Sequence, residues 1–339
     1  MRIGGSRQFA FGLQRTNREV ELGRRNRFTA STLFSRKSDG TANDIMKLFT
    51  RKSFVLTGIF LLVPPSFLEA FSRFGALSIP DETNTIKSKR GIDQTCSSFF
   101  SPPKHTDWAD VETVTIVFHG AGGEDEFTDE LMKNLNSGST ESKPSQQQSS
   151  YNHIVDWSEY SANIFQASYS GQKVGRIAAK ELLKQVGIPG NKLTAIHFIG
   201  ISVGAFAADA AVNEVTKEFE TRSSKWQNPK TGTPPFVQLT LLDPFQQRGI
   251  FGFGYGNNEF GKSADYAEQY LNTDDPVPST NKPLKKTVCY DVTSLRPENI
   301  FGHDWPLVYY ARSDRCGQLE IESRAKEENK GKAGTVVVL

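Results

Sequence analysis

Residues 194–215, TAIHFIGISVGAFAADAAVNEV, decide the fold. A run of apolar and β-branched residues ends at Gly200, and an alanine-rich run follows Gly204. The five residues 200–204, GISVG, fit the pattern Gly-x-Ser-x-Gly, in which small neighbours let a serine take a strained conformation at a sharp turn from strand to helix. The stretch therefore predicts a strand, a tight turn that presents Ser202, and a helix that continues to about Phe219.

The chain from Val111 onward alternates short apolar runs with longer segments of helical periodicity, as expected for a parallel sheet with crossover helices. We therefore predict an α/β fold in one domain, with a mostly parallel central sheet and helices on both faces. The predicted strands are residues 111–120, 152–158, 193–200, 236–244, 264–272 and 286–295, and the other predicted helices are residues 127–135 and 174–188.

A serine nucleophile needs a base, and the five histidines of the chain narrow the choice. His105 precedes the first strand, His153 and His197 lie in or beside strands, and His119 ends a strand in the turn HGAGG. Only His303, in ENIFGHDWP, lies in a loop beyond the last predicted strand, so we expect it to be the base.

The base in turn needs a carboxylate to orient it. Asp243 ends the predicted strand FVQLTLLDP, while Asp274 and Asp275 follow the next predicted strand. The oxyanion formed by nucleophilic attack needs two backbone N–H donors. We expect Val203 to supply one and Ala121, or else Gly122, to supply the other, which leaves His119 to shape the turn.

The order Ser, Asp, His is that of the α/β-hydrolase fold, and the chain resembles its pancreatic-lipase-like branch, which holds lipases and phospholipases A1. The resemblance spans residues 114–313. It is carried by TIVFHG, Asp156-Trp157, QASYSGQKVGRIAAKELL, GISVGA, LTLLDP, ADYAEQYLNTD and HDWPLVYYARS. It implies a serine hydrolase of acyl-lipid esters, with the catalytic acid directly after the strand residues LTLL, so Asp243 is expected to orient His303.

The chain also departs from that branch. Ile201 stands where the family has a histidine, Ala121 where it has an aromatic residue, and only residues 294–302 stand where it has a long lid. These differences favour phospholipid, galactolipid or soluble esters over emulsified triglyceride. The segment 245–263 interleaves glycines with aromatic residues, among them Phe251, Phe253 and Tyr255. It is a flexible flap over an acyl site or a membrane-touching loop, or else a loop whose aromatic residues pack on the domain.

The N-terminal part of the chain reads as targeting sequence. Residues 1–90 carry 16 Lys and Arg against 7 Asp and Glu, and the remainder carries 24 against 31. Residues 1–45 form a basic extension without a nucleic-acid motif. Residues 46–70 have the layout of a secretory signal peptide, with a single-pass anchor as the alternative. We expect a secreted or lumenal protein; a phenylalanine after the Ala70 junction also resembles plastid targeting.

The remaining segments complete the predicted organisation. Residues 71–110 form a linker and first elements, residues 111–320 the catalytic domain, residues 137–150 a polar disordered insertion and residues 321–339 a tail. Cys289 and Cys316 are the expected disulfide pair, which leaves Cys96 free. No metal spacing, dinucleotide fingerprint or phosphate loop occurs, so the sequence implies no metal and no cofactor. The expected partner is an acyl-ester or lipid substrate, and not a nucleic acid.

Overall fold

The computed structural model describes residues 99–100, 106–138, 150–188, 190–228, 232–321 and 333–339. Cys96, His105, the extension 1–45, the signal segment 46–70 and residues 139–149 of the polar insertion lie outside these ranges. In the described part of the chain, no helix is both long and apolar enough to cross a membrane.

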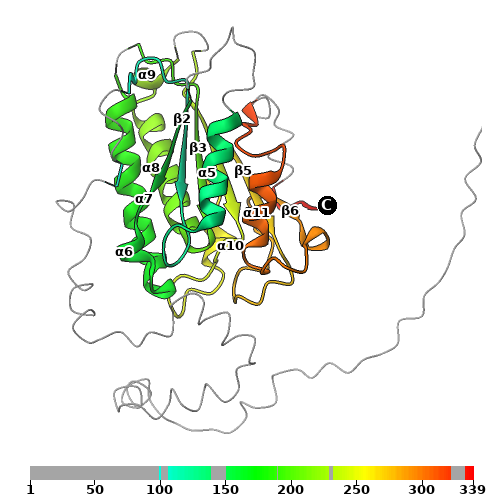
Figure 1. Cartoon of the computed structure of the whole chain (residues 1–339). Coiled ribbons are helices and arrows are strands. Elements are labelled where there is room, and N and C mark those ends of the chain that lie inside the picture. Colours follow the sequence, from blue (N-terminus) through cyan, green and yellow to red (C-terminus); the bar gives the residue numbers. More distant parts are fainter. Residues whose placement is uncertain (1–98, 101–105, 139–149, 189, 229–231, 322–332) are drawn as a thin grey trace, which may run out of the picture. The chain divides into compact units, whose positions relative to one another are not determined.

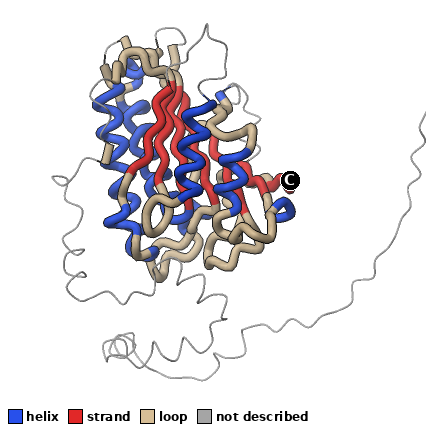
Figure 2. Tube along the Cα trace, in the orientation of Figure 1, coloured by secondary structure: helices blue, strands red, loops and turns tan. Residues whose placement is uncertain are grey.

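The core of the described residues is a seven-stranded sheet in the order β2-β1-β3-β4-β5-β6-β7. Every neighbouring pair is parallel, which agrees with the predicted α/β class. Figure 2 shows the strands as a central layer between helices. The strands are β1 (Thr113–Phe118), β2 (Ser150–Val155), β3 (Ala195–Ile201), β4 (Phe236–Leu242), β5 (Tyr266–Leu271), β6 (Val288–Asp291) and β7 (Val336–Val338).

Helices cover both faces of the sheet (Figure 1). Side chains of β1 alternate between two apolar clusters: Ile116 and Phe118 join the cluster that includes α7 and α8, while Val117 joins the cluster that includes α5 and α11. Buried apolar side chains of this size each contribute roughly 1.5–3 kcal/mol. The helices are α5 (Glu126–Gly138), α6 (Ser158–Ser161), α7 (Ile164–Val186), α8 (Ala205–Thr221), α9 (Ser223–Trp226), α10 (Tyr255–Glu259) and α11 (Trp305–Arg312), with 3-10 turns at Ser202–Gly204 (η2) and Thr293–Leu295 (η3).

The strand order alone indicates where a ligand site is expected. The chain passes from β1 outward to β2 and then back across β1 to β3, so the order reverses between β1 and β3. In open α/β sheets, ligands bind outside the carboxyl ends of the strands at such a reversal. The loops that begin there are the HGAGG turn after β1 and the turn at Ser202 after β3.

Two features of the C-terminal part differ from expectation. β7 lies within the segment predicted as a tail and extends the sheet beyond β6. The predicted disulfide between Cys289 and Cys316 is wrong, because both are free cysteines. Cys289 is fully buried in β6, between β5 and β7. Cys316 lies beyond α11, where it packs against the cluster that contains Tyr310 and Leu131.

Candidate active site

Ser202 lies at the turn between β3 and α8 and has a φ of +51°, in the left-handed region that a residue with a side chain rarely adopts. The flanking glycines make the turn possible. A Cβ on Gly200 would lie 2.8 Å from Ala205 Cα, and a Cβ on Gly204 would lie 2.3 Å from the carbonyl oxygen of Phe118. The backbone strain predicted from the Gly-x-Ser-x-Gly pattern is therefore present at Ser202.

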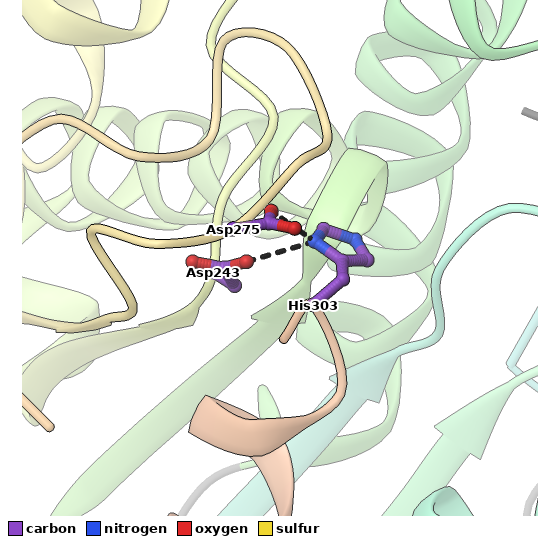
Figure 3. Close-up of side chains that lie close together, drawn as sticks. All are labelled: Asp243, Asp275 and His303. Atoms are coloured by element: carbon purple, nitrogen blue, oxygen red, sulfur yellow. Dashed lines mark hydrogen bonds and ion pairs between the residues drawn. The ribbon is translucent and has the colours of Figure 1, made fainter. Parts of the chain in front are cut away.

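His303 links the serine to two carboxyl groups, and Figure 3 shows its ring beside Asp243 and Asp275. Its Nε2 lies 2.8 Å from Ser202 Oγ. Its Nδ1 lies 2.8 Å from Asp243 Oδ2 and also 2.8 Å from Asp275 Oδ2. Because the neutral imidazole carries one proton, a proton on Nδ1 is shared between the two carboxyl groups and leaves Nε2 free to accept from the serine hydroxyl.

The two carboxyl groups come from the ends of neighbouring strands. Asp243 directly follows β4 and has a φ of +47°, and its N–H donates to the carbonyl of Tyr270 on β5. Asp275 comes from the loop after β5. The sequence favoured Asp243 over Asp274 or Asp275, and the structure places both Asp243 and Asp275 against His303. Asp274 is exposed at the surface.

Three residues that the sequence did not single out, two with polar side chains and one through its backbone N–H, hold this arrangement. Asn272 is fully buried; its Nδ2 donates to the carbonyl of Gly302, next to His303, and its backbone N–H lies 3.4 Å from Asp243 Oδ1. The Val277 N–H donates to Asp275 Oδ1, and the Thr280 hydroxyl donates to Asp275 Oδ2. A single amide or hydroxyl in a loop leaves no pattern in the sequence, so no signal pointed to these residues.

The charges in this cluster are coupled. Burial raises the pKa of Asp243 well above its usual range, against the hydrogen bond from His303, and the charge of Asp275 adds to the rise. Burial acts in the same direction on Asp275, but the charge and hydrogen bond of His303 outweigh it and lower the pKa of Asp275. Burial would lower the pKa of His303, yet the charge of Asp275 and the hydrogen bonds to both carboxyl groups raise it to about 10.

The HGAGG turn lies beside the serine: a Cβ on Gly120 would be 3.4 Å from Ser202 Cβ. The buried side chain of His119 shapes this turn, as predicted. Its Nδ1 bonds to the Gly120 carbonyl at 2.9 Å, and its Nε2 accepts the N–H of Trp157 at 3.2 Å. Desolvation lowers the pKa of His119, so the ring is neutral.

The two residues expected to donate to an oxyanion belong to the two turns that meet where Gly120 approaches Ser202. Val203 is the second residue of η2, which leads into α8, and Ala121 lies in the HGAGG turn. N–H groups in the first turn of a helix have no intrahelical partner, and the helix dipole favours negative charge there. The position of Val203 thus meets the chemical demand on an oxyanion donor.

The aromatic residues of segment 245–263 divide into two groups. Phe251 and Phe253 are 86% and 73% exposed. Tyr255 stacks on Phe206 with ring centroids 5.6 Å apart, while Phe245 and Phe260 are buried. The segment is therefore packed on the domain at both ends and presents two aromatic side chains to solvent between them.

The first residue of this segment is hydrogen-bonded to the serine, because the Phe245 N–H donates to the carbonyl of Ser202. Figure 1 shows α10, which follows the exposed aromatics, at the same end of the sheet as α6. Because α6 comes shortly after β2, this is the end at which the parallel strands finish. The aromatic pair therefore belongs to the edge of the sheet that carries the candidate site.

Among the described residues, the one group of donors close enough to hold a metal ion is Asp243, Asp275 and His303, with ligand atoms within 4.8 Å of one another. The 2.8 Å separations from Nδ1 to the two oxygens are hydrogen-bond lengths. Neighbouring ligand atoms of a tetrahedral zinc site are about 3.3 Å apart, given metal–ligand bonds of about 2.0–2.1 Å. The spacing thus fits a shared proton better than an ion.

Two of the histidines set aside from the sequence, His197 and His153, make their contacts outside this cluster. His197, on β3, bonds through Nε2 to the Thr240 hydroxyl at 2.7 Å, and burial lowers its pKa to about 3. His153 lies on β2 with its ring edge-on to Phe100.

Comparison with known proteins adds nothing to this geometry: no protein-family model matches the chain, and no curated protein matches it significantly.

Proposed function

We propose that the protein is a serine hydrolase of carboxylic esters with the α/β-hydrolase fold, and that acyl-lipid esters are its substrates. The observation that carries the proposal is the 2.8 Å contact between His303 Nε2 and the hydroxyl of Ser202, a serine held in a strained turn after a parallel strand. A nucleophile within hydrogen-bond reach of a base, itself oriented by a carboxylate, is the general arrangement of an activated serine.

The proposed reaction uses these groups in sequence. His303 Nε2 takes the proton of Ser202 as Oγ attacks the ester carbonyl, and the oxyanion accepts hydrogen bonds from the N–H groups of Val203 and Ala121. The intermediate collapses to an acyl-serine and the alcohol, which leaves with the proton of His303. Water, deprotonated by His303, then releases the acid and regenerates Ser202. Asp243 holds the imidazole and stabilises its charged form.

An acyl-lipid substrate is supported by the surroundings of the site. Ser202 and His303 are only 3% and 6% exposed, so a substrate has to reach them through a covering of loops. The exposed Phe251 and Phe253 belong to the segment 245–263, whose first residue bonds to the Ser202 carbonyl. We expect them to contact an acyl chain or a lipid surface during that entry. A secretory destination, expected from residues 46–70, is part of the proposal and can be checked by N-terminal sequencing for a start near Phe71.

Other functions of the same fold are alternatives to ester hydrolysis. A thioesterase, acyltransferase or peptidase would use the same three groups, and a product assay with a lipid ester and an alcohol acceptor separates them. A non-catalytic binding protein of this fold typically lacks one member of the triad. The contacts of His303 with Ser202 and Asp243 favour a catalytic protein over that alternative.

A fluorophosphonate probe tests the proposal directly, because it reacts only with an activated serine. We expect labelling at Ser202, located by peptide mass spectrometry, and loss of labelling in Ser202→Ala. Ser224→Ala is the matched control, since Ser224 is an exposed serine on α9. An unlabelled wild-type protein, or labelling that persists in Ser202→Ala, would overturn the assignment. A panel of p-nitrophenyl and phospholipid esters then defines the substrate.

A further inference from the structure

We propose that Asp275 is a second acid of the site, which shares the Nδ1 proton of His303 with Asp243 and sets the pH range in which the base works. The inference deepens the proposed function and rests on it. The proposed reaction needs one carboxylate on His303, and the structure supplies two from different strands at the same distance. Asp275 would be a positioning residue, since it acts on Ser202 only through His303.

The contacts of Asp275 argue against a chance neighbour. Its side chain is fully buried, and both of its oxygens accept hydrogen bonds from its own loop, Oδ1 from the Val277 N–H and Oδ2 from the Thr280 hydroxyl. Buried carboxylates are costly unless they are paired and hydrogen-bonded. The loop that carries Asp275 thus stabilises the negative charge of its carboxylate. Among the described contacts, the one side chain that can offer this carboxylate a positive charge is His303.

Asp243 is placed differently. Its backbone is held to β5 by the N–H bond to Tyr270, and its Oδ1 lies 3.4 Å from the Asn272 N–H. Asn272 also anchors the loop of His303 through Gly302. The two acids are therefore held by separate loops, and a hydrogen bond also joins their side chains. Because each has backbone anchors of its own, we expect the loss of one carboxylate to leave the other within reach of the imidazole.

The ionisable groups that act on His303 come from two of the elements packed around it: Asp243 after β4 and Asp275 after β5. Ser202 faces it from the end of β3. Cys289, on β6, stays neutral, because burial together with the charges of Asp291 and Asp243 raises the pKa of its thiol to about 12. Removing either carboxylate should make the imidazolium less stable and allow His303 to become a free base at lower pH.

The test compares Asp243→Asn, Asp275→Asn and the double variant by pH profiles of kcat/KM on p-nitrophenyl acetate. Removing the only acid of a triad costs about 10⁴-fold. If the acids share the task, each single variant should lose less than about 100-fold and move the acid limb of the profile to lower pH, while the double variant loses about 10⁴-fold. Asp274→Asn, an exposed neighbour, is the matched control and should leave the profile unchanged.

The proposal fails if Asp243→Asn alone loses as much as the double variant while Asp275→Asn keeps the wild-type profile. If Asp275→Asn does not fold, as judged by circular dichroism, Thr280→Val removes one donor from Asp275 Oδ2 and leaves Asp243 untouched. Asp275 Oδ2 should then accept more strongly from His303 Nδ1, which stabilises the imidazolium. The acid limb of the kcat/KM profile should therefore move to higher pH. An unmoved limb would contradict a role for Asp275.

A second readout does not depend on ester hydrolysis. In Ser202→Ala, the imidazole of His303 can be titrated by NMR in the presence and absence of each carboxylate. A lower His303 pKa in both Asp243→Asn and Asp275→Asn supports the shared proton even if every ester tested proves inert, in which case the proposed function fails and the paired acids remain. A His303 pKa that responds to Asp243 alone overturns the proposal.

Discussion

Gly204 lies directly against the end of β1: a Cβ at this position would be 2.3 Å from the carbonyl oxygen of Phe118 and 2.6 Å from that of His119. The turn that presents Ser202 is thereby pressed onto the turn that carries Ala121. This contact joins the nucleophile to the expected oxyanion donors through backbone alone, with no side chain between them.

Gly204→Ala should therefore destabilise the protein by about 1–3 kcal/mol or more, because backbone atoms on both sides have to move. Chemical unfolding monitored by circular dichroism measures the loss. Gly171→Ala, on α7, is the matched control, since its Cβ would meet its nearest neighbours at 3.4 Å. It should leave stability nearly unchanged. Equal stability of the two variants would contradict the close packing at Gly204.

The sequence predicts the fold well where burial is continuous. Six of the seven strands were expected, and four of them, β1, β3, β4 and β5, are buried along their whole length. The parallel order follows from the alternation of strands with helices. β7 was not expected, because three exposed valines make too short a run to distinguish from a tail. The disulfide was wrongly expected because the spacing of two cysteines along the chain gives no information on how far apart the fold places them.

The sequence predicted those residues of the site that follow the ends of strands. Ser202, Asp243 and His303 were expected together because each follows a strand that ends at the same edge of the sheet. The simultaneous contact of Asp275 and Asp243 with His303 was not expected. It depends on how residues 272–280 fold back over that edge of the sheet. Hydrogen bonds of Asn272 and Thr280 fix this path, and their residue types alone do not reveal it.

Asn272 should matter for catalysis although it touches neither Ser202 nor an ester. Its side chain holds the Gly302 carbonyl at 2.8 Å, so Asn272→Leu should let the His303 loop shift and lower kcat/KM by about 10²-fold, the usual cost of a misplacement of about 1 Å. Hydrolysis of p-nitrophenyl acetate measures the effect. Asn213→Leu, on α8, is the control away from the site and should retain activity. Wild-type kcat/KM in Asn272→Leu would exclude this positioning role.

Activity should rise with pH across the neutral range. His303 has to be neutral to accept the proton of Ser202, and the neighbouring carboxylates raise its pKa to about 10. Below that pKa the neutral fraction grows about tenfold for each pH unit, so kcat/KM on a soluble ester should increase steeply between pH 7 and pH 9. Rates are corrected with Ser202→Ala at each pH. A plateau already reached at pH 7 would show that the carboxylates do not hold the imidazolium.

Phe251 and Phe253 should matter for lipid assemblies and not for soluble esters. The two side chains are 86% and 73% exposed, on a segment whose start bonds to Ser202, so they can enter a lipid surface without disturbing the core. Phe251→Ser/Phe253→Ser should reduce hydrolysis of phospholipid vesicles by about tenfold or more, since each buried aromatic contributes roughly 1.5–3 kcal/mol. Hydrolysis of p-nitrophenyl acetate should stay within about twofold.

The matched control for this pair is Ile188→Ser, which removes an exposed apolar side chain just beyond α7, at the opposite end of the sheet. Sedimentation with vesicles, carried out in a Ser202→Ala background, separates binding from turnover. The aromatic double variant should stay in the supernatant while Ile188→Ser sediments like the parent. If all three sediment alike and the vesicle rates are equal, the aromatic pair has no part in reaching the lipid, and the substrate has to enter the site from solution.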